Sequence, residues 1–347
     1  MKQIALIDIG SNTIRLVIYE LDHSQDSRFK QEDSATGSYK QPTNALSAVS
    51  PTRLFSKKRM VGLAGYVDKD NNLSDDGVTA ACGSLKYLQK LCDALRVRER
   101  YFFATASLRN IGNSKQVCSI IEQTCNISID LISSKDEALL GYAAFKHDAP
   151  FESGLLCDVG GGSTELVCFE EKSLETKQGK PNSCQAQQVQ AALSMPIGSL
   201  KLFKRHVSGI LPSKAEIKAM KTDALEMIKI SCKEQDLTSE LQLCAIGGSA
   251  RAIKKLANSF HGLNEGNKKL SQEQIKELAD VLYSANKKAR KLILQNCPDR
   301  AHTIVPGLII LEEVIEIFNT QRIYISNYGI REGYLYQRLL ATDDAYC

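Results

Sequence analysis

The sequence predicts an α/β protein with two similar domains that face each other across a central cleft. Three observations support this prediction. The chain has 347 residues, which is enough for two cores at about 150 residues per domain. Segments with the pattern of strands alternate with segments that have the pattern of helices. A stretch near the N-terminus is repeated near the middle of the chain.

The repeat consists of ALIDIGSNTIRLVIYE at 5–20 and LLCDVGGGSTELVCFE at 155–170. The two copies align without a gap at an offset of 150 residues, and Asp8/Asp158 and Gly10/Gly160 are identical pairs. In each copy an apolar strand reaches an aspartate, a turn of small residues follows, and a second apolar strand returns. This pattern predicts a β-hairpin in each domain.

The turns of these hairpins indicate a phosphate site. Glycine lets backbone N–H groups approach a ligand closely, and consecutive N–H groups form a nest for anions. An aspartate at the strand end, beside such a nest, is placed to hold Mg²⁺ directly or through water. Two matching copies predict that a chain of phosphates binds between the turns. The alternative is two ordinary structural hairpins.

The first half of the chain contains further expected elements. Residues 21–52 are polar and are expected to form a long mobile excursion. Ser74 is expected to cap a helix whose apolar positions recur with helical spacing. The other expected elements are strands at 59–67, 101–104 and 127–132, a helix through Ile120, and a helix that starts at Ser134.

The second half is expected to be mainly helical around a few strands. Residues 171–193 are rich in Gln and are expected to form a polar loop. After it come helices over 199–235, a strand at 241–246, a helix that opens at Gly247, Lys/Arg-rich helices over 271–295, an apolar helix at 304–319, a strand at 322–326 and an amphipathic segment at 330–340.

Composition excludes several classes of protein. Hydrophobic residues are 43% and charged residues 24%, which is typical of a globular protein and not of a disordered, collagen-like or coiled-coil chain. No apolar run approaches the roughly 18 to 20 residues of a membrane span, and Asp8 comes too early for a signal-peptide core, so we expect a cytoplasmic protein. The 11 Cys and five His are dispersed, which predicts reduced thiols and no zinc site.

The positive charge of the chain is uneven. The formal net charge is +4, but residues 196–300 hold 19 Lys and Arg against 11 Asp and Glu, a local surplus of +8. A basic second half fits a polyanionic partner. The alternative is a set of solvated helix faces.

With these motifs placed, the sequence resembles the exopolyphosphatase/guanosine pentaphosphate phosphatase (Ppx/GppA) family, in its short two-domain form. The resemblance runs from about residue 3 to 340, with breaks at 21–52 and 171–193. The motifs are DIGSNTIRL at 8–16, ATASLRN at 104–110, ISSKDEALLGY at 132–142, DVGGGSTEL at 158–166, GGSARAIKKLA at 247–257 and GIREGYLYQRL at 329–339.

The resemblance implies two actin-like (ribonuclease H-like) domains. Domain I is expected at 1–130, with the C-terminal helix at about 329–347 folded back onto it, and domain II at 131–328. The family match implies that Glu137 is the catalytic base, and that Asp8, Asp158 and Glu165 hold Mg²⁺ (or Mn²⁺). The implied phosphate-binding residues are Ser11, Asn12, Thr13, Arg109, Gly160, Gly161, Gly162, Ser163, Thr164, Gly247 and Gly248.

Two of these positions, Glu137 and Arg109, have a structural alternative. Ser134-x-x-Glu137 also fits a capping box, in which the glutamate accepts a hydrogen bond from the Ser134 N–H. Arg109 fits a surface salt bridge. Arg331 and Glu332 are expected to form an ion pair that anchors the last helix.

The resemblance implies a hydrolase in which water attacks a terminal phosphorus. The substrate is polyphosphate, shortened from its end, or the 5′ γ-phosphate of guanosine pentaphosphate, and the sequence does not choose between them. Two alternatives are a kinase-type phosphotransferase of the same fold group and a non-catalytic protein that binds polyphosphate or alarmone. We expect no membrane partner and no specific nucleic acid, and a homodimer is possible by analogy.

Overall fold

The computed structural model describes residues 2–22, 50–148, 151, 153–171, 187–233 and 242–340. Most of the predicted excursion at 21–52 and of the predicted loop at 171–193 lies outside the described residues. Within the described ranges, no helix is long and apolar enough to cross a membrane.

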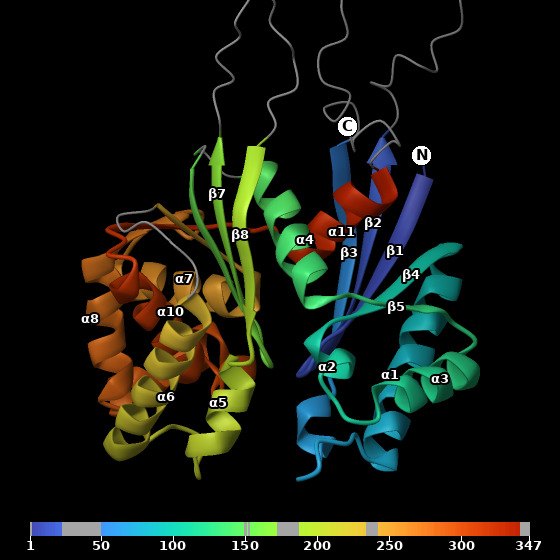
Figure 1. The fold of residues 1–347 in the computed structure, drawn as a ribbon. Coiled ribbons are helices and arrows are strands. Elements are labelled where there is room, and N and C mark those ends of the chain that lie inside the picture. Colours follow the sequence, from blue (N-terminus) through green and yellow to red (C-terminus); the bar gives the residue numbers. More distant parts are fainter. Residues whose placement is uncertain are drawn as a thin grey trace, which may run out of the picture.

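The first of two β-sheets is built from the N-terminal part of the chain (Figure 1). Its strand order is β3-β2-β1-β4-β5, and β1 pairs antiparallel with β2 and parallel with β4. The strands are β1 (Lys2–Ile9), β2 (Thr13–Asp22), β3 (Ser50–Met60), β4 (Glu99–Ala104) and β5 (Ile129–Leu131).

The second sheet repeats this arrangement with one more strand. Its order is β10-β11-β9-β6-β7-β8, and β6 pairs antiparallel with β7 and parallel with β9, as β1 does with β2 and β4. The strands are β6 (Gly154–Val159), β7 (Thr164–Glu171), β8 (Gln187–Met195), β9 (Leu243–Ile246), β10 (Lys269–Ser271) and β11 (Arg322–Ile325). The sequence repeat therefore corresponds to a repeated fold, and both sheets belong to an α/β protein.

Helices cover one face of the first sheet. Ser74 caps α1 as the sequence predicts, because its side chain accepts a hydrogen bond from the Gly77 N–H. Alternate residues of β1 serve two cores: Ala5 and Ile7 pack toward α1 and α3, while Ile4 and Leu6 pack toward the C-terminal helix. The helices are α1 (Asp75–Ala94), α2 (Ala106–Arg109) and α3 (Ser114–Cys125).

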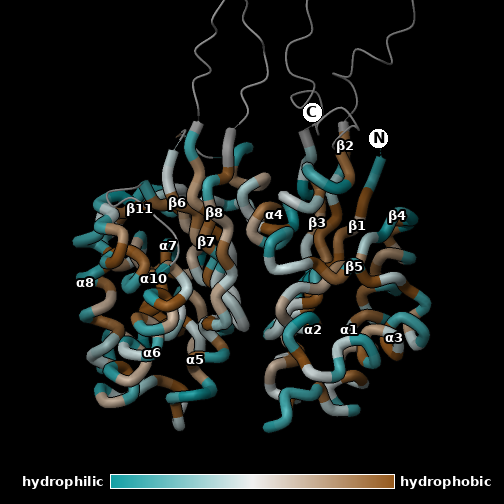
Figure 2. Tube along the Cα trace, viewed as in Figure 1, coloured by the Kyte–Doolittle hydropathy of each residue, from teal (hydrophilic) through white to brown (hydrophobic). Residues whose placement is uncertain are grey.

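The helices of the second sheet surround α10 (Ile304–Ile317), which is buried along most of its length, as its apolar sequence predicts. Figure 2 shows hydrophobic residues along the strands and α10, with hydrophilic residues on the outer sides of the surrounding helices. Those helices are α5 (Ser199–His206), α6 (Lys214–Cys232), α7 (Gly247–His261), α8 (Gln272–Tyr283) and α9 (Lys287–Asn296).

Two helices lie between the sheets. α4 (Ser134–Lys146) and α11 (Ile330–Tyr334) pack against each other in the middle of the molecule (Figure 1). The Tyr334 ring stacks on Phe103 of the first sheet, with ring centroids 4.6 Å apart. The last helix thus packs on the first sheet, although the domain limits at 130 and 328 stay predictions.

Two sequence predictions of secondary structure are wrong. The strand expected at 59–67 is instead β3 at 50–60, and residues 63–66 form a 3₁₀ turn. Residues 187–193, expected in a loop, belong to β8. Both are edge strands, which tolerate charged and polar side chains. β3 shows no apolar alternation, whereas β8 alternates over Val189, Ala191, Leu193 and Met195 but begins with polar residues.

Candidate active site

The two repeated turns have the same local geometry. The Gly10 N–H donates to the Thr13 carbonyl at 3.0 Å, and the Gly160 N–H donates to the Ser163 carbonyl at 3.0 Å. Each turn therefore closes over two central residues. The aspartates precede the turns at equivalent positions: Asp8 pairs across the hairpin with Arg15, and Asp158 with Glu165.

Neighbouring segments hold the turns through their carbonyl oxygens. The Asn12 carbonyl accepts from the N–H groups of Val61 and Gly62, and the Gly161 carbonyl accepts from those of Leu200 and Lys201 at the start of α5. This leaves backbone amides of the turns available for an anion. The turns also approach each other, because a Cβ built on Gly161 would lie 3.5 Å from the Ser11 Cβ.

Both turns open onto one cleft between the sheets, with a cavity volume of about 150 Å³. Glu137 of α4 and the start of α7 complete its walls. The structure therefore brings together most of the predicted site. The predicted residues that line the cleft are Asp8, Ser11, Asn12, Thr13, Glu137, Asp158, Gly160, Gly161, Gly162, Ser163, Gly247 and Gly248.

Glu137 does not form the capping box that was its alternative role. The N-cap of α4 is Ser133, one residue earlier than expected, and its Oγ accepts from the Asp136 N–H at 3.0 Å. The Glu137 carboxylate instead accepts a hydrogen bond from Arg109 Nη1 at 2.7 Å. The N–H that meets the cap belongs to Asp136, and the Glu137 side chain lines the cleft.

Arg109 lies beside the cleft and supports Glu137. The side chains of the pair are only 14% and 12% exposed, so this is not the surface salt bridge considered as an alternative. Arg109 Nη1 also donates to the Ile132 carbonyl at 2.8 Å. Its Nη2 is buried and has no hydrogen-bond partner among the described residues. Arg109 is not among the residues that line the cleft, so its expected contact with a phosphate oxygen stays a prediction.

The environment of Glu137 suits a base that works near neutral pH. Burial raises the pKa of Glu137 to about 7, the Arg109 hydrogen bond and charge oppose this rise, and the Asp158 charge adds to it. A carboxyl with this pKa is ionised in about half of the molecules at neutral pH, and the ionised form can accept a proton and pass it on.

Asp8 and Asp158 both line the cleft. Burial raises the pKa of both carboxyls, and Asp8 also receives a hydrogen bond from Arg331 Nη1 at 2.8 Å. The start of α7 packs directly on Asp158: Gly247 has φ +84°, and a Cβ there would lie 2.0 Å from Asp158 Oδ1. Only glycine fits at this position.

Two predicted site residues are placed otherwise than expected. Glu165 is 3% exposed and accepts from Ser163 Oγ at 2.7 Å and from Ser194 Oγ at 2.9 Å. Thr164 is fully buried and donates from Oγ1 to the Ile197 carbonyl at 2.7 Å. Neither side chain lines the cleft, because this part of β7 is covered by β8 and by the segment before α5. Both residues stabilise the second turn and its surroundings through these hydrogen bonds, away from the cleft.

The predicted set Asp8, Asp158 and Glu165 does not form a complete metal-binding cluster. Within the part of the chain that the structure describes, no three His, Cys, Asp or Glu side chains converge closely enough to hold a metal ion. Mg²⁺ commonly binds to one or two carboxylates and takes its other ligands from water and substrate phosphates. Asp158 and Asp8, both on the cleft, offer this smaller set of oxygen donors.

Four arginines line the cleft that were not predicted as site residues. The ion pair expected between Arg331 and Glu332 is not formed, because Arg331 pairs with Asp8 instead. Glu332 accepts hydrogen bonds from the Tyr19 hydroxyl and the Gly329 N–H. Burial lowers the pKa of Arg15 and Arg251 to about 10, which leaves both charged at neutral pH. The arginines that line the cleft are Arg15, Arg251, Arg300 and Arg331.

The four arginines outnumber the three carboxylates on the cleft walls, so the cleft suits an anion with several charges. One of these arginines had a local signal. Arg15 is a charged residue inside an apolar strand of the repeat, at a position that faces Asp8 across the hairpin. Arg251 and Arg300 lie far apart in sequence and have no comparable signal.

Two domains of this fold, with paired glycine-rich turns and a buried carboxylate on one cleft, define a class of phosphate-handling proteins. A family model described as "Ppx/GppA phosphatase family" matches residues 44–342. The chain belongs to the Ppx/GppA phosphatase family.

Individual relatives are distant. Exopolyphosphatase 1 of Mycobacterium tuberculosis is 21% identical over 343 residues, which cover 97% of this chain and 88% of that protein. A bifunctional 3-dehydroquinate synthase/phosphatase of Fusobacterium nucleatum is 24% identical over 332 residues, and the match spans 93% of this chain but only 44% of that protein. The crystal structure of an exopolyphosphatase from Cytophaga hutchinsonii has a TM-score of 0.73 at 22% identity, over 97% of this chain and 98% of that one.

Proposed function

We propose that this protein is a Mg²⁺-dependent exopolyphosphatase that releases the terminal phosphate of inorganic polyphosphate. The observation that carries the proposal is the position of Glu137 on the same cleft as both turns. The name of the Mycobacterium relative supports polyphosphate as the substrate. The arginine-rich walls also support it, because they can hold several phosphates in a row.

In the proposed reaction, water attacks the terminal phosphorus and Glu137 accepts a proton of that water. A new P–O bond forms, the bond to the bridging oxygen breaks, and the products are orthophosphate and a chain that is one phosphate shorter. Arg109 fixes the Glu137 carboxylate and offers Nη2 to a phosphate oxygen. The amides of the two turns stabilise negative charge on the phosphoryl oxygens. Mg²⁺, when held by Asp158 and Asp8, supplies further charge neutralisation.

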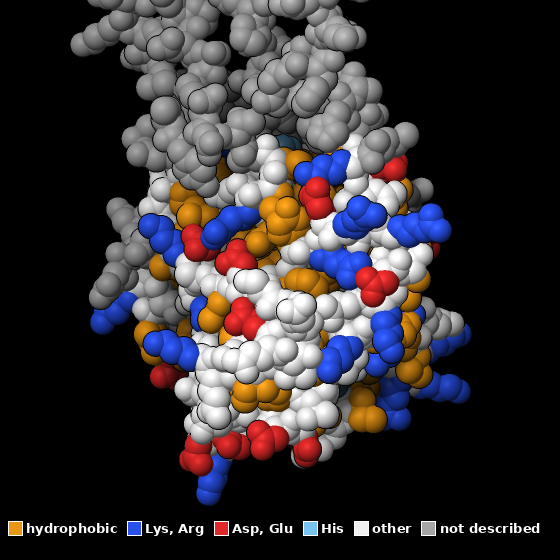
Figure 3. All heavy atoms as spheres, turned by 90° about the vertical axis from the view of Figure 1, so that its right-hand side faces the viewer, with side chains coloured by type: hydrophobic (Ala, Val, Ile, Leu, Met, Phe, Trp, Pro, Cys, Tyr) orange, Lys and Arg blue, Asp and Glu red, His pale blue; other side chains and the backbone are white. Residues whose placement is uncertain are grey.

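The cleft, and not the outer face of the first domain, supports the binding of a polyanion. Figure 3 views the outer face of the first domain, where basic, acidic and hydrophobic side chains are mixed. The surplus of +8 over residues 196–300 belongs to the second domain, where it would hold the rest of a long chain.

The proposal is tested by measuring phosphate release from tripolyphosphate, long polyphosphate and guanosine pentaphosphate side by side, with Mg²⁺ and with chelator. We expect release from polyphosphate in Mg²⁺ and little release in chelator. Phosphate release from guanosine pentaphosphate but not from polyphosphate would show that guanosine pentaphosphate is the substrate instead. Transfer of phosphate to ADP would support a kinase instead, and tight binding without any release would support a non-catalytic binder.

A further inference from the structure

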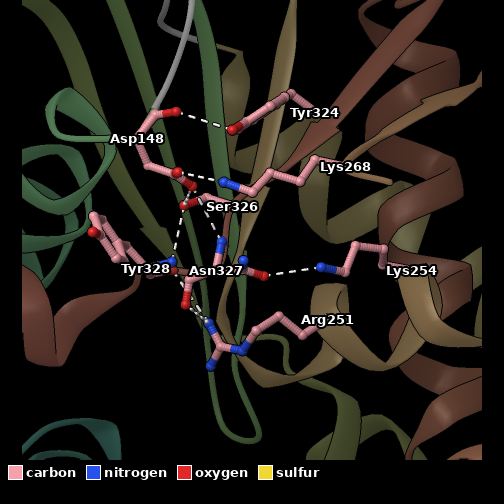
Figure 4. A network of polar contacts seen from close by, with 8 residues as sticks. All are labelled: Asp148, Arg251, Lys254, Lys268, Tyr324, Ser326, Asn327 and Tyr328. Atoms are coloured by element: carbon pink, nitrogen blue, oxygen red, sulfur yellow. Dashed lines mark hydrogen bonds and ion pairs between the residues drawn. The ribbon is translucent and has the colours of Figure 1, made fainter. Parts of the chain in front are cut away.

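Asp148, just beyond the end of α4, lies at the centre of a polar network outside the cleft (Figure 4). Its Oδ1 accepts from Lys268 Nζ at 2.6 Å. Its Oδ2 accepts from Ser326 Oγ at 2.5 Å and from the Asn327 N–H at 3.2 Å. The carbonyl of Asp148 accepts from the Tyr324 hydroxyl at 2.9 Å. One residue therefore ties the end of α4 to β11 and to the turn that follows it.

This turn, residues 326–329, joins β11 to α11 and is itself ordered by Ser326. Besides its bond to Asp148, Ser326 Oγ accepts from the Tyr328 N–H at 3.0 Å, and Ser326 is fully buried. The carboxylate of Asp148 and the hydroxyl of Ser326 thus fix the N–H groups of two successive residues of the turn.

The opposite side of the turn holds Arg251. The carbonyls of Asn327 and Tyr328 both accept from Arg251 Nη1 at 3.2 Å (Figure 4). Arg251 lines the cleft, and so do Gly329, the last residue of the turn, and Arg331, two residues after it. The carbonyls can grip Arg251 only while the turn keeps its shape, because a backbone rotation would move both acceptors.

Asp148 stays ionised in this setting. Burial alone would raise its pKa, but the hydrogen bonds and charge of Lys268 and the hydrogen bond of Ser326 outweigh burial, and the net pKa is below its ordinary value. Hydrogen bonds to a charged acceptor are stronger than neutral ones. The anchor of the turn is therefore a charge-assisted one.

We propose that Asp148 is a positioning residue for polyanion binding: it holds the 326–329 turn in the shape that presents Arg251 and Arg331 to the phosphates. The inference rests on the proposed function, because it takes the cleft as a polyphosphate site. It also links the two ends of α4, since the helix carries Glu137 near its start and leads to Asp148 at its end.

The sign of the effect of Asp148→Asn separates positioning from simple electrostatics. The substitution removes a negative charge from the neighbourhood of an anion site, so electrostatics alone would tighten binding. Loss of the anchor predicts the opposite. We expect the Kd for tripolyphosphate to rise about tenfold, as the loss of one charge-assisted contact to the ligand would produce.

Binding is measured by calorimetry with tripolyphosphate, in a Glu137→Gln background so that the ligand is not consumed. The charge-matched control is Glu265→Gln, which removes an exposed carboxylate from the same domain without touching the turn. We expect this control to bind as tightly as the background or slightly more tightly. In the otherwise unaltered chain, Asp148→Asn is expected to raise KM and to leave kcat within about threefold.

Unchanged or tighter tripolyphosphate binding by the folded Asp148→Asn protein would overturn the inference. If this variant does not fold, Ser326→Ala decides, because it removes the hydroxyl that joins Asp148 to the turn and should weaken binding in the same direction. If the wild-type protein releases no phosphate, this result refutes the proposed function but not the inference about Asp148. The Kd comparison still tests the role of Asp148.

Discussion

Arg109 and Glu137 form a largely buried ion pair, 2.7 Å between Nη1 and Oε2, in which Arg109 restrains the carboxylate but does not cancel the rise of its pKa that burial causes. The guanidinium uses one nitrogen, Nη1, to donate both to the carboxylate and to the Ile132 carbonyl. Its remaining Nη2 is buried without a partner among the described residues. The pair therefore restrains the orientation of the Glu137 carboxylate.

The pH dependence of the wild-type reaction should report Glu137. The base must be deprotonated to accept a proton, and burial raises the pKa of Glu137 to about 7. We expect kcat/KM to fall about tenfold per pH unit below that value and to level off above it. A profile with tripolyphosphate that stays flat from pH 8 down to pH 5 would contradict this assignment.

Arg109→Met should move this profile to higher pH. Arg109 lowers the pKa of Glu137 through a hydrogen bond and through its charge, so removing it leaves only the Thr105 hydrogen bond to oppose burial and Asp158. We expect the midpoint to rise by about 1 pH unit or more and KM to increase. Arg109→Lys is the matched control: it keeps the charge, so its midpoint should shift less. Equal midpoints in wild type and Arg109→Met would refute the coupling.

Glu137→Gln should abolish most turnover in a folded protein. The amide keeps the shape of the side chain but cannot accept the proton from water, and loss of such a base costs about 100- to 10,000-fold in kcat. Asp136→Asn is the control, because it removes the same charge one residue earlier, where the carboxylate meets Arg338 at the surface 3.3 Å away. Phosphate release is measured for both. Near-normal release by Glu137→Gln would remove this residue from the mechanism.

The parts of the site that could be predicted from sequence are those made by local patterns. Asp8, the Gly10 turn and their copies at 158–163 depend on a few consecutive residues, and the structure places both turns on the cleft. Apart from Arg15, which faces Asp8 across the hairpin, the cleft arginines could not be predicted in this way. Arg331 follows an expected motif but pairs with Asp8, 323 positions away in the chain.

The prediction of secondary structure failed at β3 and β8, two edge strands, for a related reason. β3 contains Arg53, Lys57, Lys58 and Arg59, and β8 begins with polar residues. An edge strand has one neighbour and needs few apolar side chains, so its sequence resembles a loop. Interior strands such as β1 and β6 are apolar because both their faces are covered, and these were predicted correctly.

Gly333→Ala should separate the two helices between the sheets. A Cβ on Gly333 would lie 1.8 Å from the Leu140 carbonyl oxygen, so α11 must move away from α4. Overpacking of this kind costs about 1–3 kcal/mol, which urea unfolding would detect. The control is Gly83→Ala in α1, where a Cβ meets no atom within 4 Å and the higher helix propensity of alanine should stabilise the protein by up to about 1 kcal/mol.

Because α4 carries Glu137 and α11 carries Arg331, the Gly333 variant should also lose phosphate release, whereas the Gly83 variant should keep it. Equal stability and activity in the two variants would show that the contact between α4 and α11 does not maintain the cleft.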